Sequence, residues 1–212
     1  KAKKPLTYFH ADIIGNLAKT GNWYSNLKED HTKFIAITKS TNHINIDLGL
    51  YQNAGATAIQ QLAYGLAHTT EYLNQLDNVI ESNSKQSLNI TFNVSLGSNY
   101  FFEIAKLRAL RQLWTALASE YGVNPNCKII AAPSKRNKTI YDYNINMLRT
   151  TTECMSAILG GANTICNLPY DALYKSSNEF GDRIARNQLL VLKQESYFDK
   201  VNNPADGAYY IE

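Results

Sequence analysis

The chain has 212 residues, of which 44% are hydrophobic and 18% are charged, and its formal net charge is +3. This length and apolar content suffice to bury one substantial core. The small charge and the scattered basic residues argue against nucleic acid as a partner. No apolar run approaches the roughly 20 residues that a membrane span needs, so we expect no contact with a membrane.

The cysteines and histidines restrict the chemistry that we expect. Cys127, Cys154 and Cys166 lack the spacing of a metal site, and their odd number argues against a disulfide framework. Three lysines near the N-terminus have no apolar segment behind them, which does not fit a signal peptide. We therefore expect reduced thiols, no metal and a cytoplasmic location. All the histidines lie in the first third of the chain, which excludes a histidine base from the remainder.

The predicted elements follow one another in a regular order after an irregular start. Residues 1–41 carry turn signals at Gly15-Asn16 and Gly21-Asn22, and we expect an irregular N-terminal connecting segment there. Strands are predicted over residues 43–48, 88–97, 127–132 and 163–167, and helices over residues 53–76, 99–122, 141–161 and 177–196. For the second helix, Asn99 is suited to be the N-cap and Gly122 to end the helix.

These alternating units predict an α/β fold. Successive strand–helix units favour a parallel sheet with right-handed crossovers. An open doubly wound sheet would normally carry a glycine-rich phosphate turn after its first strand, and the sequence has none. The other candidate is the parallel (β/α) barrel of the TIM type, which needs roughly 250 residues. We therefore predict that residues 42–212 form such a barrel only in part, with about four to five units.

The second predicted strand has two unlike faces. One face is apolar, and the other holds four small polar side chains, namely Asn89, Thr91, Asn93 and Ser95. The simplest interpretation is that this polar face meets water. If it turned inward instead, it would line a barrel with hydrogen-bonding groups, as a long polar ligand would require. In the fourth predicted strand, Thr164 and Cys166 share one face.

Several long segments of the chain resemble the methylmalonyl-CoA mutase family. They are "NAGATAIQQLAYGLAHTTEYL" (53–73), "FEIAKLRALRQLW" (102–114), "NMLRTTTECMSAILGGANTI" (146–165), "DRIARNQLLVLKQES" (182–196) and "NPADGAYYIE" (203–212). The resemblance covers about residues 42–212. It implies a barrel that takes an acyl-CoA along an axis lined by small polar side chains. That expectation favours a polar face that points into the barrel. It also gives a set of candidate lining residues: Asn89, Thr91, Asn93, Ser95, Thr164 and Cys166.

The sequence departs from the catalytic members where they contact substrate. Their "GGTQSLHTN" corresponds to "GGANTICNL" here, so the histidine that hydrogen-bonds the substrate falls on Cys166. Their glutamine after the preceding strand falls on Ala132. A thiol is a weak donor and a methyl group donates nothing. The catalytic members also bind adenosylcobalamin through a D-x-H-x-x-G motif, which residues 1–212 lack. The resemblance therefore implies a noncatalytic small (beta) subunit without a cofactor of its own, paired with a cobalamin-binding large (alpha) subunit.

Two other functions stay open. The chain could be an independent CoA-ester-binding module, with a CoA ester as its ligand. It could also be a catalytic fragment for a different acyl-CoA, with Cys166 adapting the pocket. An incomplete barrel would leave strand edges bare, so we also expect self-association unless the partner is present.

Three expectations concern individual side chains. The basic run Ser134–Lys138 is expected on a solvated surface, with a phosphate-bearing ligand as the alternative. Arg149, Arg183 and Arg186 are expected to pair with carboxylates such as Glu153 and Asp182 rather than with a CoA phosphate. Cys166 is expected to be buried and inert, because no histidine lies near it in the sequence.

Overall fold

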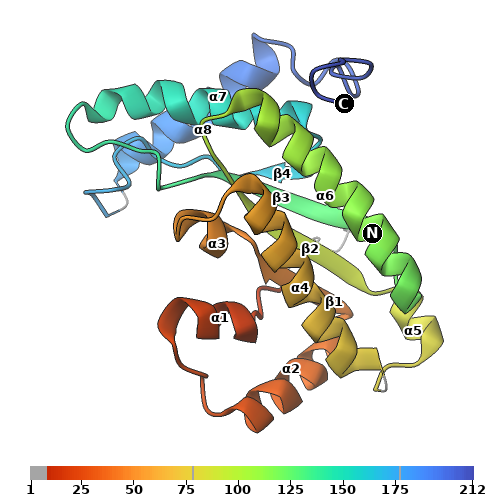
Figure 1. The fold of residues 1–212 in the computed structure, drawn as a ribbon. Helices are drawn as coiled ribbons and strands as arrows, with labels where there is room; N and C mark the ends of the chain where they lie inside the picture. Colours follow the sequence, from red (N-terminus) through yellow and green to blue (C-terminus); the bar gives the residue numbers. More distant parts are fainter. Residues whose placement is uncertain (1–8, 78, 177) are drawn as a thin grey trace, which may run out of the picture.

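A parallel sheet forms the centre of the molecule (Figure 1). The computed structural model describes residues 9–77, 79–176 and 178–212. Within that part the strands are β1 (His43–Asp47), β2 (Asn89–Leu96), β3 (Cys127–Pro133) and β4 (Thr164–Ile165). They lie in the sheet in chain order and all pair in parallel. The predicted α/β class and the parallel sheet are thereby confirmed.

Each parallel pair is joined by a crossover helix, as parallel pairing requires. The crossovers are α4 (Ala58–Asp77), α6 (Tyr100–Tyr121) and α7 (Asn146–Leu159), and α8 (Glu179–Gln194) follows β4. The shorter α3 (Gly49–Asn53), α5 (Ser82–Gln86) and 3-10 helix η1 (Tyr143–Ile145) lie in the connections. The predicted elements after residue 42 are present with shifted ends. The last predicted strand shrinks to two residues. Residue 177, where the last helix was predicted to begin, lies outside the described residues, and α8 itself begins at Glu179.

The core lies between the sheet and its crossover helices. Every second residue of the strands is apolar and points to this side; examples are Ile46, Phe92 and Ile129. Trp114 of α6 is fully buried and packs edge-on against Phe92, with 5.7 Å between the ring centroids. At the ends of α6, Asn99 accepts a hydrogen bond from the Phe102 amide, and Gly122 adopts the left-handed conformation. Both predicted caps are confirmed.

The expectation of an irregular segment over residues 1–41 is wrong for most of that range. Residues 1–8 lie outside the described part, but α1 (Ile13–Thr20) and α2 (Leu27–Thr41) are regular helices. Asp12 caps α1, and Asn26 caps α2. Of the two turn signals, Gly15-Asn16 was misread, because Gly15 lies inside α1, where a side chain would clash with the Asp12 carboxylate. Gly21 does end α1, in the left-handed conformation. Among the described helices, none is long and apolar enough to cross a membrane.

Candidate functional site

The polar strand residues share the face of the sheet that the crossover helices leave free. The register aligns Asp47 with Asn93, Asn93 with Ile130, and Ile130 with Thr164 across the strands. Thr91 and Ser95 are buried, Asn93 is half-buried, and Asn89, Thr164 and Cys166 are exposed. All six candidate residues therefore lie on one face, although only some of them are shielded from water.

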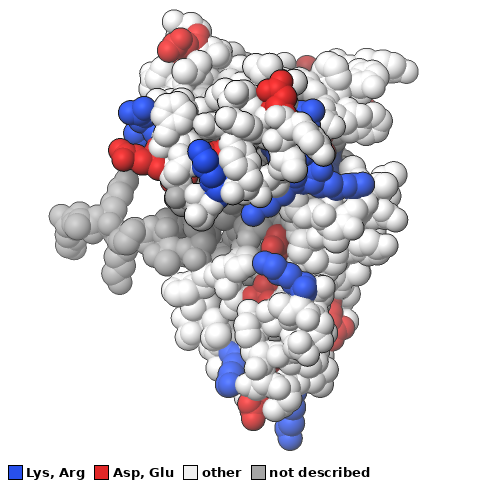
Figure 2. Space-filling model, turned by 90° about the vertical axis from the view of Figure 1, so that its left-hand side faces the viewer, with Lys and Arg blue, Asp and Glu red and all other residues white. Residues whose placement is uncertain are grey.

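A hollow of about 720 Å³ opens at the carboxyl ends of β1, β2 and β3. Ser95 and Ala132, which are aligned partners in the sheet, form part of its wall. Other lining residues come from α1, α3, the last residue of β3 and the loop that follows it: Lys19, Gly49, Leu50, Asn53, Pro133, Lys135 and Arg136. Figure 2 views the molecule from the side toward which the strands end in Figure 1, and Lys and Arg side chains gather across the middle of this face.

Asn53 of α3 ties the parts of this hollow together. Its amide nitrogen donates to Ser95 Oγ at 3.1 Å and to the Gly49 carbonyl at 2.9 Å. Its amide oxygen accepts from Ser134 Oγ at 3.3 Å and from the Lys135 amide at 3.0 Å. One side chain thus connects β2, α3 and the loop after β3. Because both ends of the Asn53 amide are used, the rim of the hollow is held in one arrangement.

Cys166 lies beside Ala132 at the tips of β3 and β4. Its amide donates to the Ala131 carbonyl at 2.9 Å. The expectation that Cys166 is buried is wrong, because its side chain is exposed at a smaller hollow of about 230 Å³ lined also by Asp182 and Arg186. The reason is that β4 pairs only with β3 in the described sheet, so no further strand shields this thiol. The tips of β3 and β4 therefore present a methyl group and a thiol.

The other two cysteines are buried in the fold. Burial raises the pKa of the Cys154 thiol to about 12, and the neighbouring charge of Glu153 adds to the rise. Burial also raises the pKa of Cys127. Both therefore stay protonated and unreactive near neutral pH. All three cysteines are free thiols, and no group of three metal-ligating side chains occurs among the described residues.

The N-terminal segment crosses the polar face of β1 and β2. His10 Nδ1 contacts the side-chain amides of Asn45 and Asn93, in the second case at 3.1 Å. The Asp12 carboxylate accepts hydrogen bonds from the amides of Gly15 and Asp47 at 2.7 and 2.9 Å. The polar face near β1 is therefore occupied by the chain's own residues, whereas its carboxyl end stays open at the hollow.

Asp12 also anchors a buried cluster with α4. Tyr72 Oη donates to Asp12 Oδ1 at 2.7 Å, and His68 Nε2 lies 2.9 Å from the same oxygen. His68 Nδ1 is 3.1 Å from Tyr51 Oη on α3. Burial alone would raise the pKa of Asp12, but the interactions with His68, the Asp47 amide and Tyr72 outweigh it and lower that pKa. This carboxylate is therefore ionised inside the fold.

A second buried ion pair corrects two expectations. Lys138 Nζ lies 2.7 Å from Glu153 Oε2, and the two side chains are only 2% and 1% exposed. Lys138 is thus not part of a solvated surface, although Lys135 and Arg136 of the same run are exposed. Glu153 pairs with this lysine and not with Arg149, whose guanidinium donates to the Asn137 carbonyl. Arg183 lies over the ring of Phe180, 5.5 Å from its centroid.

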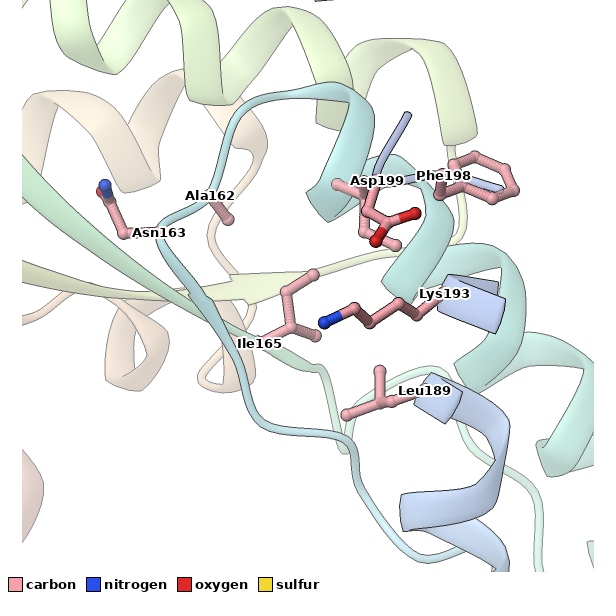
Figure 3. A pocket seen from close by; sticks show the side chains of 8 residues that line it. Ala162, Asn163, Ile165, Leu189, Lys193, Phe198 and Asp199 are labelled. Atoms are coloured by element: carbon pink, nitrogen blue, oxygen red, sulfur yellow. The ribbon is translucent and has the colours of Figure 1, made fainter. Parts of the chain in front are cut away.

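A third hollow, of about 380 Å³, lies between β4 and α8. In Figure 3, Leu189 and Lys193 extend from α8 toward Ile165 of β4, and Phe198 and Asp199 lie across from them. The hollow is largely apolar and borders the edge strand of the sheet. It is the place where a further strand and helix would pack if the sheet continued.

Sequence reasoning found the polar face and the tips of β3 and β4, but it missed the N-terminal contribution. His10 and Asp12 carry no motif, and their partners lie 35 to 83 residues away in the chain. The only available signal was a cap-type residue, Asp12, placed directly before an apolar pair. Asn53 was likewise unmarked, because its role depends on the loop after β3.

The fold and the hollow define a parallel α/β protein whose candidate site lies at the carboxyl ends of consecutive strands. Comparison with known proteins assigns it more narrowly. The model of the methylmalonyl-CoA mutase family matches residues 8–212, and the chain belongs to that family. The match begins well before residue 42, so it includes α1 and α2.

Individual relatives support the same assignment. The small subunit of methylmalonyl-CoA mutase from Porphyromonas gingivalis is 44% identical over 174 residues, which are 80% of this chain and 28% of the relative. The small subunit from Propionibacterium freudenreichii subsp. shermanii is 34% identical over 201 residues, or 93% of this chain and 30% of the relative. The large subunit from the same organism is 34% identical over 175 residues, or 81% and 24%. The chain thus spans about a quarter to a third of the length of these curated relatives.

Proposed function

We propose that this chain is part of the small (beta) subunit of a methylmalonyl-CoA mutase and has a noncatalytic role. The subunit would support a catalytic partner that isomerises methylmalonyl-CoA to succinyl-CoA. The similarity to small subunits from several bacteria supports this proposal. Similarity alone does not separate the two subunit types, because one large subunit is as similar as one of the small ones. The residues of the candidate site are what distinguish a small subunit from a large one.

The observation that carries the proposal is the pair Ala132 and Cys166 at the tips of adjacent strands. In the resemblance to catalytic members, these positions hold the glutamine and the histidine that contact the substrate. Here the Cys166 amide donates to the carbonyl of Ala131, the residue directly before Ala132, and Ala132 lines the hollow. Neither side chain can hold a substrate carbonyl firmly, because a thiol donates weakly and a methyl group not at all. A site that lacks both groups would lose much of its transition-state stabilisation.

The partner in this proposal is the large (alpha) subunit, and adenosylcobalamin would be bound there. The residues of this chain give little support for holding the cofactor themselves. All the described histidines near the polar face already contact other side chains: His10 contacts Asn93, His43 contacts Thr91, and His68 contacts Asp12. None of them lines the hollow at the strand ends.

The architecture that we propose is a partial TIM-type barrel within a longer subunit. Four parallel strands in chain order, each followed by a helix, are what half of such a barrel requires. The candidate lining residues Asn89, Thr91, Asn93, Ser95, Thr164 and Cys166 would then face the axis. The apolar hollow beside β4 would be filled by the next strand–helix unit.

Co-expression with a cobalamin-binding large subunit from the same source tests the proposal. We expect light scattering to show a stable one-to-one complex. We also expect the intact small subunit, supplied alone with adenosylcobalamin and methylmalonyl-CoA, to form no succinyl-CoA. Production of succinyl-CoA by this subunit alone would refute the noncatalytic role, and failure to associate would refute the partnership.

The open hollow and the polar face also support a second candidate function, in which the chain is an independent CoA-ester-binding module. Calorimetry separates the two proposals. A CoA ester that binds the isolated subunit with a saturable heat would support the module, and the absence of any heat on a folded subunit would exclude it. Cys166→His in the reconstituted complex adds a further test. An unchanged turnover with this variant would argue against an active-site role for Cys166.

A further inference from the structure

Large apolar side chains crowd the surface formed by the connections that follow β3 and β4. On the β3 side, Tyr141 and Leu148 are 94% and 68% exposed, and Tyr143 of η1 is exposed as well. On the β4 side, Tyr174 and Phe180 are also exposed. We call these five side chains the aromatic patch. Exposed apolar surface of this density is typical of a site that contacts another protein.

Ring contacts join the two sides of the aromatic patch. The ring centroid of Tyr143 lies 5.1 Å from that of Tyr174 and 5.9 Å from that of Tyr170. Tyr170, which is itself buried, meets Phe180 edge-on at 6.4 Å. The aromatic side chains of η1, of the loop after β4 and of α8 therefore form one continuous surface.

Buried polar side chains hold the backbone beneath this surface. Asn146 is fully buried, accepts the Thr139 amide at 3.0 Å and donates to the Tyr170 carbonyl at 2.9 Å. Asn178, the N-cap of α8, donates to the buried Asp171 at 2.6 Å. The two connections are thus tied to each other and to α8. Because the surface is ordered in advance, a partner that docks on it has a smaller entropic cost to overcome.

The charge around the aromatic patch is positive in sum. Arg183 lies over the ring of Phe180, 5.5 Å from its centroid, and no carboxylate in the described part of the chain lies within ion-pair distance of it. Over the described residues of 134–145 and 166–186, the exposed cations are Lys135, Arg136, Lys175, Arg183 and Arg186, and the exposed carboxylates are Asp142, Glu179 and Asp182. Figure 2 shows the Lys and Arg side chains across this face.

This charge restricts the kind of partner. A complementary surface needs carboxylates around an apolar centre. A second copy of the same chain would meet the patch with the patch itself, because a twofold contact pairs identical surfaces, and the excess positive charges would then oppose each other. The charge therefore favours a different protein with an acidic surface.

We propose that the large subunit docks on the aromatic patch with apolar side chains that are surrounded by carboxylates. This inference rests on the partnership proposed above and adds the surface that the partner contacts. Tyrosine and arginine are enriched among the side chains that supply most of the binding energy in protein interfaces. The aromatic side chains would then supply most of the affinity, whereas Arg183 at the edge would mainly increase the rate of association.

Surface plasmon resonance with the intact large and small subunits tests the apolar part. The double variant Tyr141→Ser, Leu148→Ser should weaken the complex by about tenfold or more, chiefly through faster dissociation. The matched control Tyr24→Ser, Leu27→Ser changes two side chains that are 70% and 58% exposed outside the patch, and its affinity should equal that of the wild type. Thermal unfolding of each free small subunit shows whether the variants fold as the wild type does.

A charge reversal tests the electrostatic part. Arg183→Glu should slow association with the large subunit and make the association rate less sensitive to added salt. Lys28→Glu reverses an exposed charge on α2, outside the patch, and serves as the control. Its association rate should stay close to that of the wild type.

The possible failures can be told apart. A complex that forms with wild-type affinity in both patch variants would overturn this inference and leave the partnership intact. Unchanged association together with a less stable free small subunit would mean that the rest of that subunit covers the patch, which also overturns it. Patch variants that lose only the self-association of the small subunit would assign the patch to a second copy. If the wild-type subunits did not associate at all, the partnership itself would be refuted, and this inference with it.

Discussion

At the scale of single residues, the buried pair Lys138–Glu153 is the clearest stabilising interaction next to the site. Lys138 Nζ lies 2.8 and 2.7 Å from the two oxygens of Glu153, and both side chains are almost fully enclosed. Asn137 donates to the same carboxylate. Burial raises the pKa of Glu153, while Lys138 and Asn137 oppose that rise. The pair thus holds the loop after β3 against α7, although each charge alone would be costly.

Lys138→Met should therefore destabilise the fold by roughly 3–5 kcal/mol, because it leaves a buried carboxylate without its cation. Urea unfolding measures this loss. The double variant Lys138→Met, Glu153→Leu should recover most of the stability, since no uncompensated charge remains. Lys33→Ala breaks only an exposed pair with Glu29 at 3.8 Å and should cost less than about 1 kcal/mol. Equal losses in the two single variants would contradict the role assigned to Lys138.

Asp12 is a single residue that makes the stability of the fold depend on pH. Burial would raise the pKa of Asp12, but His68, Tyr72 and the Asp47 amide hold it below the ordinary value of 3.8. The stability that Asp12 contributes is therefore present above that value and is lost as the pH falls through the lower folded pKa. Asp47, whose pKa is raised, acts with the opposite sign. A comparison between wild type and Asp12→Asn cancels the groups that do not interact with Asp12. The variant also lowers the raised pKa of Asp47, because the Asp12 charge contributes to that rise.

We expect Asp12→Asn to be less stable at neutral pH and to lose stability more gradually between about pH 5 and pH 2. The measurement is the urea midpoint as a function of pH for both proteins. Asn26→Ala, which removes the cap of α2 but no charge, serves as the control and should keep the wild-type slope. Parallel curves for Asp12→Asn and wild type would mean that this carboxylate is not specifically stabilised in the fold.

At the scale of elements, the contact between α4 and β1 depends on one glycine. A Cβ atom added at Gly65 would lie 2.4 Å from Leu48 Cγ, and Leu48 is fully buried at the end of β1. Alanine normally stabilises a helix relative to glycine by about 1 kcal/mol. Here the clash in a close-packed core should outweigh that gain.

Gly65→Ala is therefore expected to lower the free energy of unfolding by about 1–3 kcal/mol. Thermal unfolding followed by circular dichroism checks this. Ala63→Gly, at an exposed position of the same helix, isolates the intrinsic propensity and should cost about 1 kcal/mol. A stabilised Gly65→Ala protein would show that α4 can move away from β1 at little cost.

The elements also show how far the sequence could be interpreted. Alternating apolar residues in β2 and the helical spacing in α6 are local patterns, so both elements and both caps of α6 could be predicted. The row of polar side chains from Asn89 to Ser95 could also be recognised in the sequence. Whether this row faces water or the inside of a barrel could not, because that depends on which face of the sheet the helices cover. The pairing of Lys138 with Glu153 and the contacts of His10 are long-range contacts between side chains of no special pattern. Periodicity contains no information about such partners, and a helix as short as α1 leaves too few residues to reveal one.

At the scale of the whole molecule, the edge of the sheet is the feature that most affects behaviour in solution. β4 pairs with β3 alone in the described part, and the apolar hollow beside it is lined by Ile158, Ile165 and Leu189. An unpaired strand edge next to apolar surface favours association. In the longer subunit that we propose, the following units would cover this edge.

The isolated segment 1–212 should therefore associate with itself as its concentration rises. Light scattering across a concentration series measures this, and we expect an average mass above 23.8 kDa, the mass of one chain. Leu189→Lys places a charge in the hollow beside the edge and should shift association to higher concentration. Lys33→Gln on α2, far from that edge in the sequence and exposed, is the matched control. A segment that stays monomeric at high concentration would show that α8 and the tail already protect the edge, and the case for a continuing barrel would lose its support from this surface.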